Sequence, residues 1–292
     1  MAKQKNKLQT FNIDQNNYIS KGMVHQSTLR SQINEALNHN RFKQNYIISS
    51  LPGLGKSFEI EKALGKMKKP PLKFQGSSSI YTFTIDIATA VYLNKRQPFV
   101  VVLDDCDVLF ENKNMNITKK MFDDARVLKY GKNYTSLKPL CTDLQWEALE
   151  SFADPARAGL DIPVDKITFI ILTNIYFEKV NDVEKQEEGT PKYANANARY
   201  AIRRRTAFKE IKMAPQDLWG YVTNVIMNEK ICEKSMPHIT TAHKIQIANW
   251  LYANWSSVTE RNLSLVEKMT QDIVKYPRNY LDVWTQEYLE VV

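Results

Sequence analysis

Short apolar runs punctuate the first two thirds of the chain. Residues 45–50, 99–103 and 167–173 form three of them, and polar or turn-forming residues bound each one. Such runs are typical of strands that are covered on both faces of a sheet. Residues 72–74 and 211–213 predict two further short strands. Because helical patterns separate these runs, the sequence predicts an α/β fold with a parallel sheet.

Apolar residues recur at helical spacing between the strands. Helices are predicted over residues 26–40, 58–67, 79–94, 115–129 and 144–152. Two segments are harder to interpret: residues 132–137 suit one arm of a hairpin, and the polar stretch 183–200 is interpreted as a mobile insertion.

The pattern changes from Pro215 onward, where only helices are indicated. They are predicted over residues 215–230, 239–254, 258–275 and 277–290. The chain is therefore expected to consist of a basic N-terminal arm (1–20), an α/β core (21–213) and a small all-α domain (214–292).

Composition and charge narrow the class of protein without defining its chemistry. Of 292 residues, 43% are hydrophobic and 25% are charged, which excludes a disordered chain, a collagen and a coiled coil. The net charge of +8 fits a nucleic-acid or nucleotide partner, although many proteins with such a charge bind neither. The three cysteines indicate neither a disulfide framework nor a zinc cluster, and no apolar run reaches membrane-spanning length. We expect a soluble cytoplasmic protein without a membrane partner.

A glycine-containing turn follows the first strand and opens a helix. Residues 50–57 read Ser-Leu-Pro-Gly-Leu-Gly-Lys-Ser and match the phosphate-loop pattern except at Ser50, where the pattern has glycine. Glycines let backbone N–H groups turn toward a phosphate, Lys56 can reach the β- and γ-phosphates, and Ser57 can ligate Mg²⁺. ATP and Mg²⁺ binding is predicted here, and an accidental turn is the alternative. The residues expected to contact nucleotide are Pro52, Gly53, Leu54, Gly55, Lys56, Ser57 and Phe58.

Two acidic residues, Asp104 and Asp105, follow the apolar run at 99–103. In P-loop enzymes such a strand lies beside the phosphate loop, and its first carboxylate holds Mg²⁺, usually through water. Asp104 is therefore the candidate metal ligand. Asp105 is the candidate general base that orients and deprotonates the attacking water. The alternative is a strand end capped by two solvated carboxylates.

Asn174 and a run of arginines are further candidates. Asn174 directly follows the strand at 167–173. In a parallel sheet the carboxyl ends of the strands line the ligand crevice, so the Asn174 amide could hold the attacking water or contact the γ-phosphate. The alternative is a turn residue that only terminates the strand. The three adjacent guanidinium groups of residues 203–205 must point in different directions. Arg204 or Arg205 is expected to enter a neighbouring subunit's site, and the alternatives are a basic surface strip or contacts with DNA phosphates.

Arg261 is a candidate in the third C-terminal helix. It is expected either to reach the phosphates from the helical domain or to pair with acidic residues on the helix surface.

The order of these features resembles that of the AAA+ ATPases over roughly residues 20–290. Residues 103–107, and residues 201–202 followed by arginine, are similar to a group of AAA+ ATPases encoded by tailed bacteriophages. The resemblance implies that Asp104 and Asp105 form the Walker B motif, that Asn174 is sensor 1, and that Arg205 or Arg204 is the arginine finger. It also implies that Arg261 is sensor 2, with Arg278 as a rival.

The resemblance further implies an ATP hydrolase whose α/β core carries a helical lid and assembles into a ring, usually a hexamer, with ATP between subunits. Residues 76–82 lie where family members place a pore loop, and residues 130–140 form a second candidate projection. Lysines and tyrosines there suit a single DNA strand in a channel, and ordinary loops are the alternative. The expected role is to couple ATP hydrolysis to action on DNA, as a translocase or helicase-like enzyme in phage DNA replication, in the bacterial host cytoplasm and together with a replication protein. The rivals are a protein remodeller, a loader of a helicase or of a clamp, and an ATP-dependent scaffold on DNA with little turnover.

Overall fold

The computed structural model describes most of the chain, in two compact units. The described residues are 11–38, 45–50, 52–67, 71–76, 79–95, 97–111, 114–154, 156–177, 179–188 and 190–290. Residues 1–10 of the predicted arm and residues 77–78 of the predicted pore loop lie outside them. One unit, the loop–helix unit, combines residues up to 32, residues 51–60 and residues from 212 onward. The other, the sheet unit, combines residues 33–50 and 61–211.

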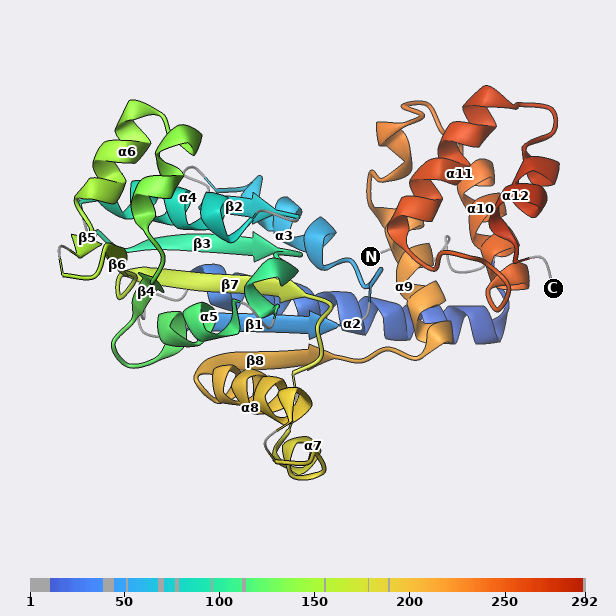
Figure 1. Ribbon diagram of the computed structural model, residues 1–292. Helices are drawn as coiled ribbons and strands as arrows, with labels where there is room; N and C mark the ends of the chain where they lie inside the picture. Colours follow the sequence, from blue (N-terminus) through green and yellow to red (C-terminus); the bar gives the residue numbers. More distant parts are fainter. Residues whose placement is uncertain are drawn as a thin grey trace. The chain divides into compact units, whose positions relative to one another are not determined.

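Five parallel strands form the main sheet of the sheet unit (Figure 1). They are β1 (Asn45–Ser50), β2 (Leu72–Gln75), β3 (Phe99–Asp104), β7 (Ile167–Thr173) and β8 (Thr206–Ile211). Hydrogen bonds join them in the spatial order β2-β3-β7-β1-β8, and each pairing is parallel. The predicted α/β fold with a parallel sheet is confirmed.

Strand position explains the burial of each strand. The central strands β1 and β7 are buried at every residue, as their unbroken apolar runs predict, whereas the edge strands β2 and β8 are partly exposed. The acidic strand β3 is separated from β1 by β7. One prediction needs correction. The last strand begins at Thr206, ahead of the predicted residues 211–213.

Helices cover the sheet through aromatic contacts. Phe83 of α4 (Ile80–Leu93) packs edge-on against Phe74 of β2, with ring centroids 5.6 Å apart. Phe122 of α5 (Met115–Phe122) meets Phe169 of β7 at 5.9 Å. Such edge-to-face pairs favour a defined packing as well as burying area. The short helix η1 (Asp107–Phe110) follows β3.

A small antiparallel sheet replaces part of a predicted helix. It has the order β4-β6-β5, with β4 (Val127–Tyr130), β5 (Ala153–Asp154) and β6 (Gly159–Pro163). The predicted helix 115–129 therefore ends at Phe122, and its last residues belong to β4. The predicted hairpin arm at 132–137 is wrong, because that segment enters the 3-10 helix η2 (Tyr134–Leu140). Helix α6 (Asp143–Glu150) agrees with the prediction for 144–152.

Residues 183–200, predicted to form a mobile insertion, are mostly helical. Most of them belong to α7 (Val180–Glu184) and α8 (Pro191–Arg204). Thr190 accepts a hydrogen bond from the Tyr193 N–H, and Pro191 occupies the first turn, so α8 has a regular N-terminal cap. Polar composition alone is a poor guide here, because one face of α8 still buries Ala196 and Ile202.

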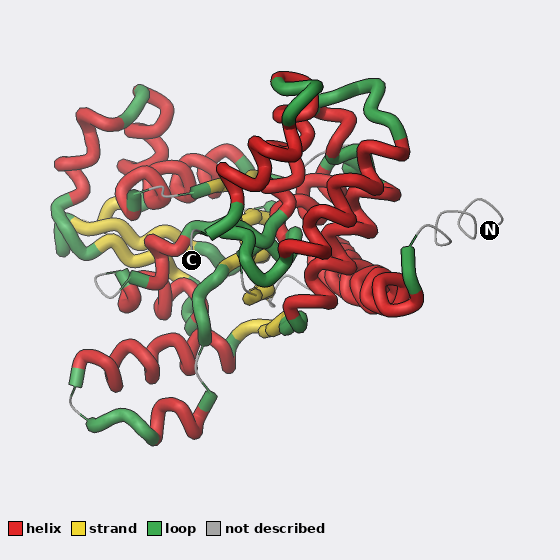
Figure 2. The backbone as a smooth tube through the Cα atoms, turned by 90° about the vertical axis from the view of Figure 1, so that its right-hand side faces the viewer, coloured by secondary structure: helices red, strands yellow, loops and turns green. Residues whose placement is uncertain are grey.

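The loop–helix unit carries the predicted C-terminal helices (Figure 2). They are α9 (Pro215–Asn228), α10 (Thr241–Asn254), α11 (Leu263–Lys275) and α12 (Tyr280–Tyr288), with the short η3 (Cys232–Lys234) after α9. Helix α2 (Ile13–Asn38) begins within the predicted arm, so residues 13–20 are helical rather than irregular. The unit also holds residues 51–60, so it includes the start of α3 (Lys56–Leu64). No helix in the described ranges is long and apolar enough to cross a membrane.

Candidate functional site

The phosphate-loop segment has the backbone that anion binding requires. Gly53 and Gly55 adopt φ angles of +82° and +75°, in the left-handed region that glycine tolerates best. Helix α3 begins at Lys56, so its first N–H groups and the positive end of its dipole face the loop. Lys56 is 5% exposed and Leu54 is buried. Such a loop can cradle phosphate oxygens through backbone donors.

The other loop positions differ in exposure. Pro52 is exposed, and Ser57 is half-buried at the first turn of α3. Phe58 is half-buried and packs against the apolar cluster of the C-terminal helices. The structure therefore gives Phe58 a packing role, and contact with nucleotide stays a prediction for that residue.

Residues from the C-terminal part of the chain pack directly against the two loop glycines. A Cβ added at Gly53 would lie 2.7 Å from the Arg261 carbonyl oxygen and 2.8 Å from the Asn262 Cβ. A Cβ added at Gly55 would overlap the hydroxyl of Tyr221. Both positions therefore exclude any side chain, for steric as well as conformational reasons. Sequence reasoning missed Tyr221, because nothing in its own segment distinguishes it from a core tyrosine.

Arg261 does not occupy the predicted position on a helix. It precedes α11, whose N-cap is Asn262, and its Nη2 donates to the Ser256 carbonyl oxygen at 2.7 Å. The part of Arg261 that meets the loop is its backbone carbonyl. A sensor role for its guanidinium stays a prediction, as it does for the exposed Arg278.

A buried carboxylate ties the phosphate-loop helix to two other helices. Glu59 of α3 is 2% exposed and accepts hydrogen bonds from Arg30 Nε at 2.6 Å and Gln26 Nε2 at 2.6 Å, both on α2. Arg30 Nη2 also reaches Glu229, which caps α9, at 2.5 Å. Asn224 of α9 donates to Gln26 Oε1 at 2.6 Å. These five residues, the Glu59 network, connect α2, α3 and α9 within one unit.

The carboxyl edge of the main sheet gathers the predicted acidic and amide groups. Asp104 ends β3 and is 1% exposed, whereas Asp105 is exposed. Asn174, directly after β7, donates from Nδ2 to Asp105 Oδ1 at 3.1 Å. Asp105 has φ +55°, which is strained for a non-glycine residue and is often found at functional sites. The structure thus brings together Asp105 and Asn174, which are 69 residues apart in sequence.

A lysine that the sequence did not single out faces Asp104. Lys73 Nζ of β2 lies 3.3 Å from Asp104 Oδ2 and 3.0 Å from Glu61 Oε1. Burial acts to lower the pKa of Lys73, but its hydrogen bonds and ion pairs with Glu61 and Asp104 outweigh that effect and raise the pKa. The ammonium group is therefore firmly charged, and Asp104 already sits beside a cation.

The oxygen donors fit Mg²⁺ only as a partly hydrated ion. Among the described residues, no group of three or more His, Cys, Asp or Glu side chains could hold a metal by itself. Magnesium commonly uses one or two protein oxygens and completes its shell with water and phosphate oxygens. The Asp104 carboxylate, which already accepts a cationic partner, is a donor of that kind.

The three arginines at the end of α8 have different surroundings, as their adjacency predicts. Arg203 donates to the Phe177 carbonyl oxygen at 2.8 Å and stacks 4.2 Å from the Phe208 ring centroid. Arg205 Nε pairs with Asp123 at 3.0 Å. Arg204 is exposed, with its guanidinium 5.8 Å from the centroid of the Tyr200 ring. Within the described part of the chain, Arg204 thus has the guanidinium that is least engaged of the three.

Parts of the two predicted projections lie side by side. Tyr81, in the first turn of α4, and Tyr130, at the end of β4, have ring centroids 6.3 Å apart. Lys132 Nζ lies 5.6 Å from the centroid of the Tyr81 ring. These three residues line a pocket of about 220 Å³ between the segments.

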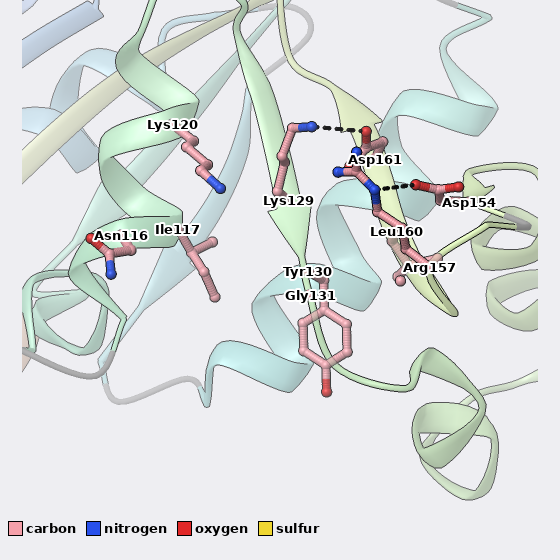
Figure 3. Close-up of a pocket in the computed structure, with 11 residues that line it drawn as sticks. Asn116, Ile117, Lys120, Lys129, Tyr130, Gly131, Asp154, Arg157, Leu160 and Asp161 are labelled. Carbon is pink, nitrogen blue, oxygen red and sulfur yellow. Dashed lines mark hydrogen bonds and ion pairs between the residues drawn. The ribbon is translucent and has the colours of Figure 1, made fainter.

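A second pocket adjoins the small sheet (Figure 3). It has a volume of about 250 Å³ and shares Tyr130 with the first. Two ion pairs line it, Lys129–Asp161 at 3.1 Å and Arg157–Asp154 at 3.7 Å, while Lys120 extends from α5 (Figure 3). The basic groups slightly outnumber the acidic ones on this surface.

Comparisons with known proteins leave the family open. No protein-family model matches the chain, and no curated protein matches it. Among solved structures, the chain is similar to the closed-state cryo-EM reconstruction of Hsp104 with ATPγS and FITC casein, at 12% identity and a TM-score of 0.42. The similarity covers 84% of this chain and 42% of that one, so the chain spans less than half the length of the Hsp104 chain. The fold assignment rests on the strand order and register described above.

Proposed function

We propose that the chain is a P-loop ATP hydrolase of the AAA+ type. The observation that carries this proposal is the strand–loop–helix at the end of β1, where Gly53 and Gly55 both have positive φ and Lys56 opens α3. Asp104, Asp105 and Asn174 at the carboxyl edge of the parallel sheet supply the acidic and amide groups that hydrolysis needs.

In the proposed reaction, backbone N–H groups of the loop and Lys56 bind the phosphates of ATP. Ser57 and Asp104 would hold Mg²⁺, which when bound neutralises phosphate charge. Asp105 accepts a proton from the attacking water. Asn174 donates to one oxygen of that carboxylate and so holds its orientation.

We further propose that the chain assembles into a ring, a hexamer as in the family that it resembles, with an arginine completing each neighbouring site. Arg204 is the better candidate because Arg203 and Arg205 are held by Phe177 and Asp123. An exposed guanidinium at the end of a helix can approach a phosphate with its planar fork of donors. Arg205 is the second candidate.

The proposed substrate is a single DNA strand, in phage DNA replication. The support is the exposed ring of Tyr81 with Lys132 beside it, because aromatic rings stack on bases and lysines attract phosphates. Tyr130 is buried and supports the Tyr81 ring by edge-on packing. One rival is a protein remodeller, or a loader that places a helicase or a clamp on DNA. The exposed ring of Tyr81 would also suit contact with an extended polypeptide. A DNA-bound scaffold with little turnover is the other rival.

The rate of ATP hydrolysis, measured with and without single-stranded DNA, tests these proposals. We expect turnover that single-stranded DNA stimulates, and a larger particle in the presence of Mg²⁺ and a slowly hydrolysed ATP analogue. Stimulation by a protein partner alone would favour the remodeller or loader. Absence of turnover in all conditions, with ATP still bound, would favour the scaffold.

A pair of variants addresses the DNA contact itself. Lys132→Glu should weaken single-stranded DNA binding and reduce its stimulation of hydrolysis, because a carboxylate repels the phosphate that the ammonium group attracts. Lys166→Glu, at an exposed position beside the adjacent Asp165, is the matched control. Equal DNA binding by both variants would place the DNA elsewhere.

A further inference from the structure

Three successive residues at the end of β7 bind the segment that follows β3. The Leu172 carbonyl oxygen accepts a hydrogen bond from the Asp105 N–H at 3.0 Å, and Asn174 Nδ2 donates to Asp105 Oδ1 at 3.1 Å. Between these two bonds, Thr173 Oγ1 donates to Asp107 Oδ1 at 2.9 Å. Asp107 takes no part in the proposed reaction, so its bond with Thr173 requires a separate explanation.

The Thr173 hydroxyl joins two segments because it is a donor and an acceptor at once. While its proton is directed to Asp107, its oxygen accepts a hydrogen bond from the Ile175 N–H at 3.0 Å. Thr173 is 0% exposed and Asp107 is half-buried, so water competes little for either bond. The hydroxyl therefore fixes the backbone on the carboxyl side of Asn174 relative to the start of η1.

The chain beyond Asn174 is also held by β1. Ser49 is the register partner of Thr173 in the sheet, and its Oγ donates to the Ile175 carbonyl oxygen at 2.7 Å. β3, β7 and β1 are neighbours in the sheet (Figure 1). Ser49, Asp107, Thr173 and Ile175, here called the strand-end clamp, thus join the segments at the carboxyl ends of these three strands. All four residues belong to the sheet unit.

The strand-end clamp encloses Asn174 in the sequence. Asn174 itself is exposed, whereas the residues on either side of it are held by hydrogen bonds. We propose that Thr173 is a positioning residue whose hydroxyl, bound to Asp107 and to the Ile175 N–H, holds the Asn174 amide against the Asp105 carboxylate. The inference rests on the proposed hydrolase, in which Asp105 activates the attacking water. It gives Asp107 a role in the same reaction, through Thr173.

Thr173→Val tests the proposal, because it keeps the branched shape of the side chain and removes the hydroxyl. We expect kcat to fall by about 10- to 100-fold, since a small misplacement of a group that acts on the water lowers the rate by such factors. The Kd for Mg²⁺–ATP, measured by calorimetry, should not change, because no clamp residue belongs to the phosphate loop. Thr173→Ser restores the hydroxyl and should recover most of kcat.

Thr168→Val is the matched control on the same strand. Thr168 is 2% exposed, and its hydroxyl has no hydrogen-bond partner among the described residues, so this variant should keep the wild-type kcat. Asp107→Ala removes the acceptor of the same hydrogen bond from a half-buried position, and it should lower kcat as Thr173→Val does. It also provides the test if Thr173→Val fails to fold, which thermal unfolding of each variant shows.

A double variant shows whether Thr173 acts through Asn174. In an Asn174→Ala background, Thr173→Val should cause no further loss of kcat, because the group that it positions is already absent. A full further loss in that background would overturn the proposal. So would a wild-type kcat in both Thr173→Val and Asp107→Ala, even with a lower unfolding midpoint, because the clamp would then only stabilise the fold. A wild-type chain without ATP turnover would instead refute the proposed hydrolase, and the role of the clamp with it.

Discussion

Lys56 and Tyr221 meet the same loop but differ in how the sequence reveals them. Lys56 follows a glycine in a recognisable pattern, so its position at the start of α3 could be predicted. Tyr221 lies far later in the sequence, in a helix of ordinary composition, and only tertiary packing brings its hydroxyl to Gly55. Lys73 is similar, because the pairing of β2 with β3 places its ammonium beside Asp104. Single residues whose role depends on long-range contacts have no local signature.

Lys56→Ala should weaken ATP binding more than any other single change in the loop. The variant removes the charged side chain that reaches the phosphates, so we expect the Kd for Mg²⁺–ATP to rise by about 10- to 100-fold. Fluorescence titration with a labelled ATP measures this. Lys66→Ala, at an exposed position beyond the end of α3, is the control. Unchanged ATP binding by Lys56→Ala would mean that the segment is not a phosphate loop.

Asp105→Asn should separate binding from hydrolysis. The amide keeps the size of the side chain but cannot accept a proton from water, so we expect turnover to fall by about a hundredfold or more while ATP binding persists. Steady-state hydrolysis and calorimetric binding together measure the split. If the variant hydrolyses ATP at the wild-type rate, the general base is another group.

At the scale of elements, apolar content decides which predictions hold. The runs at β1, β3 and β7 are recognisable because buried parallel strands are apolar on both faces. β4 and β5 escape prediction, since strands of four and two residues are too short to show a period. Helix α8 and the first half of α2 were not predicted, because in both segments polar residues outnumber the buried apolar residues that pack the helix against its unit. The strained φ of Asp105 could not be predicted from residue type at all.

The Glu59 network should contribute to the stability of the loop–helix unit. Arg30→Met leaves the Glu59 carboxylate buried without its cation. We expect the free energy of unfolding to fall by about 3 kcal/mol. This is near the lower end of the loss for broken buried ion pairs, because Arg30 is partly exposed. Denaturant unfolding measures the change. Lys21 lies on the same helix as Arg30, is itself exposed, and pairs loosely with Asp217 of α9 at 3.7 Å; Lys21→Met should cost less than about 1 kcal/mol. Equal losses in the two variants would show that the network stabilises the unit no more than an exposed ion pair does.

The sequence predicts the fold class of the whole molecule, but it does not predict how the chain divides into compact units. The order of strands and helices indicates a parallel sheet followed by helices, which the structure confirms. The assignment of residues 51–60 to the same compact unit as the C-terminal helices follows from packing between segments far apart in sequence. The net charge of +8 comes from several groups of basic residues. Some of them, namely Lys56, Lys73 and the arginines at 203–205, belong to the proposed ATPase site.

Assembly provides the strictest test of the proposed ring, because it requires two chains to share one site. Arg204→Ala should retain ATP binding, since its own loop is intact, but its turnover should fall by about a thousandfold if the guanidinium acts on a neighbour's phosphate. Lys56→Ala should also be inactive, for lack of bound ATP. Mixing the two variants creates interfaces in which an intact loop meets an intact arginine, so activity should return in the mixture.

Lys192→Ala, at an exposed position on the same helix as Arg204, is the control and should retain full activity. The mixture is compared with each variant alone at the same total concentration and with the size of the particle measured in parallel. If particles form but mixing restores nothing, Arg204 acts within its own chain or not at all, and the same experiment with Arg205→Ala decides whether its neighbour takes the role. If no particle larger than the monomer forms with nucleotide, a site shared between subunits is excluded, and hydrolysis must be completed by groups of a single chain.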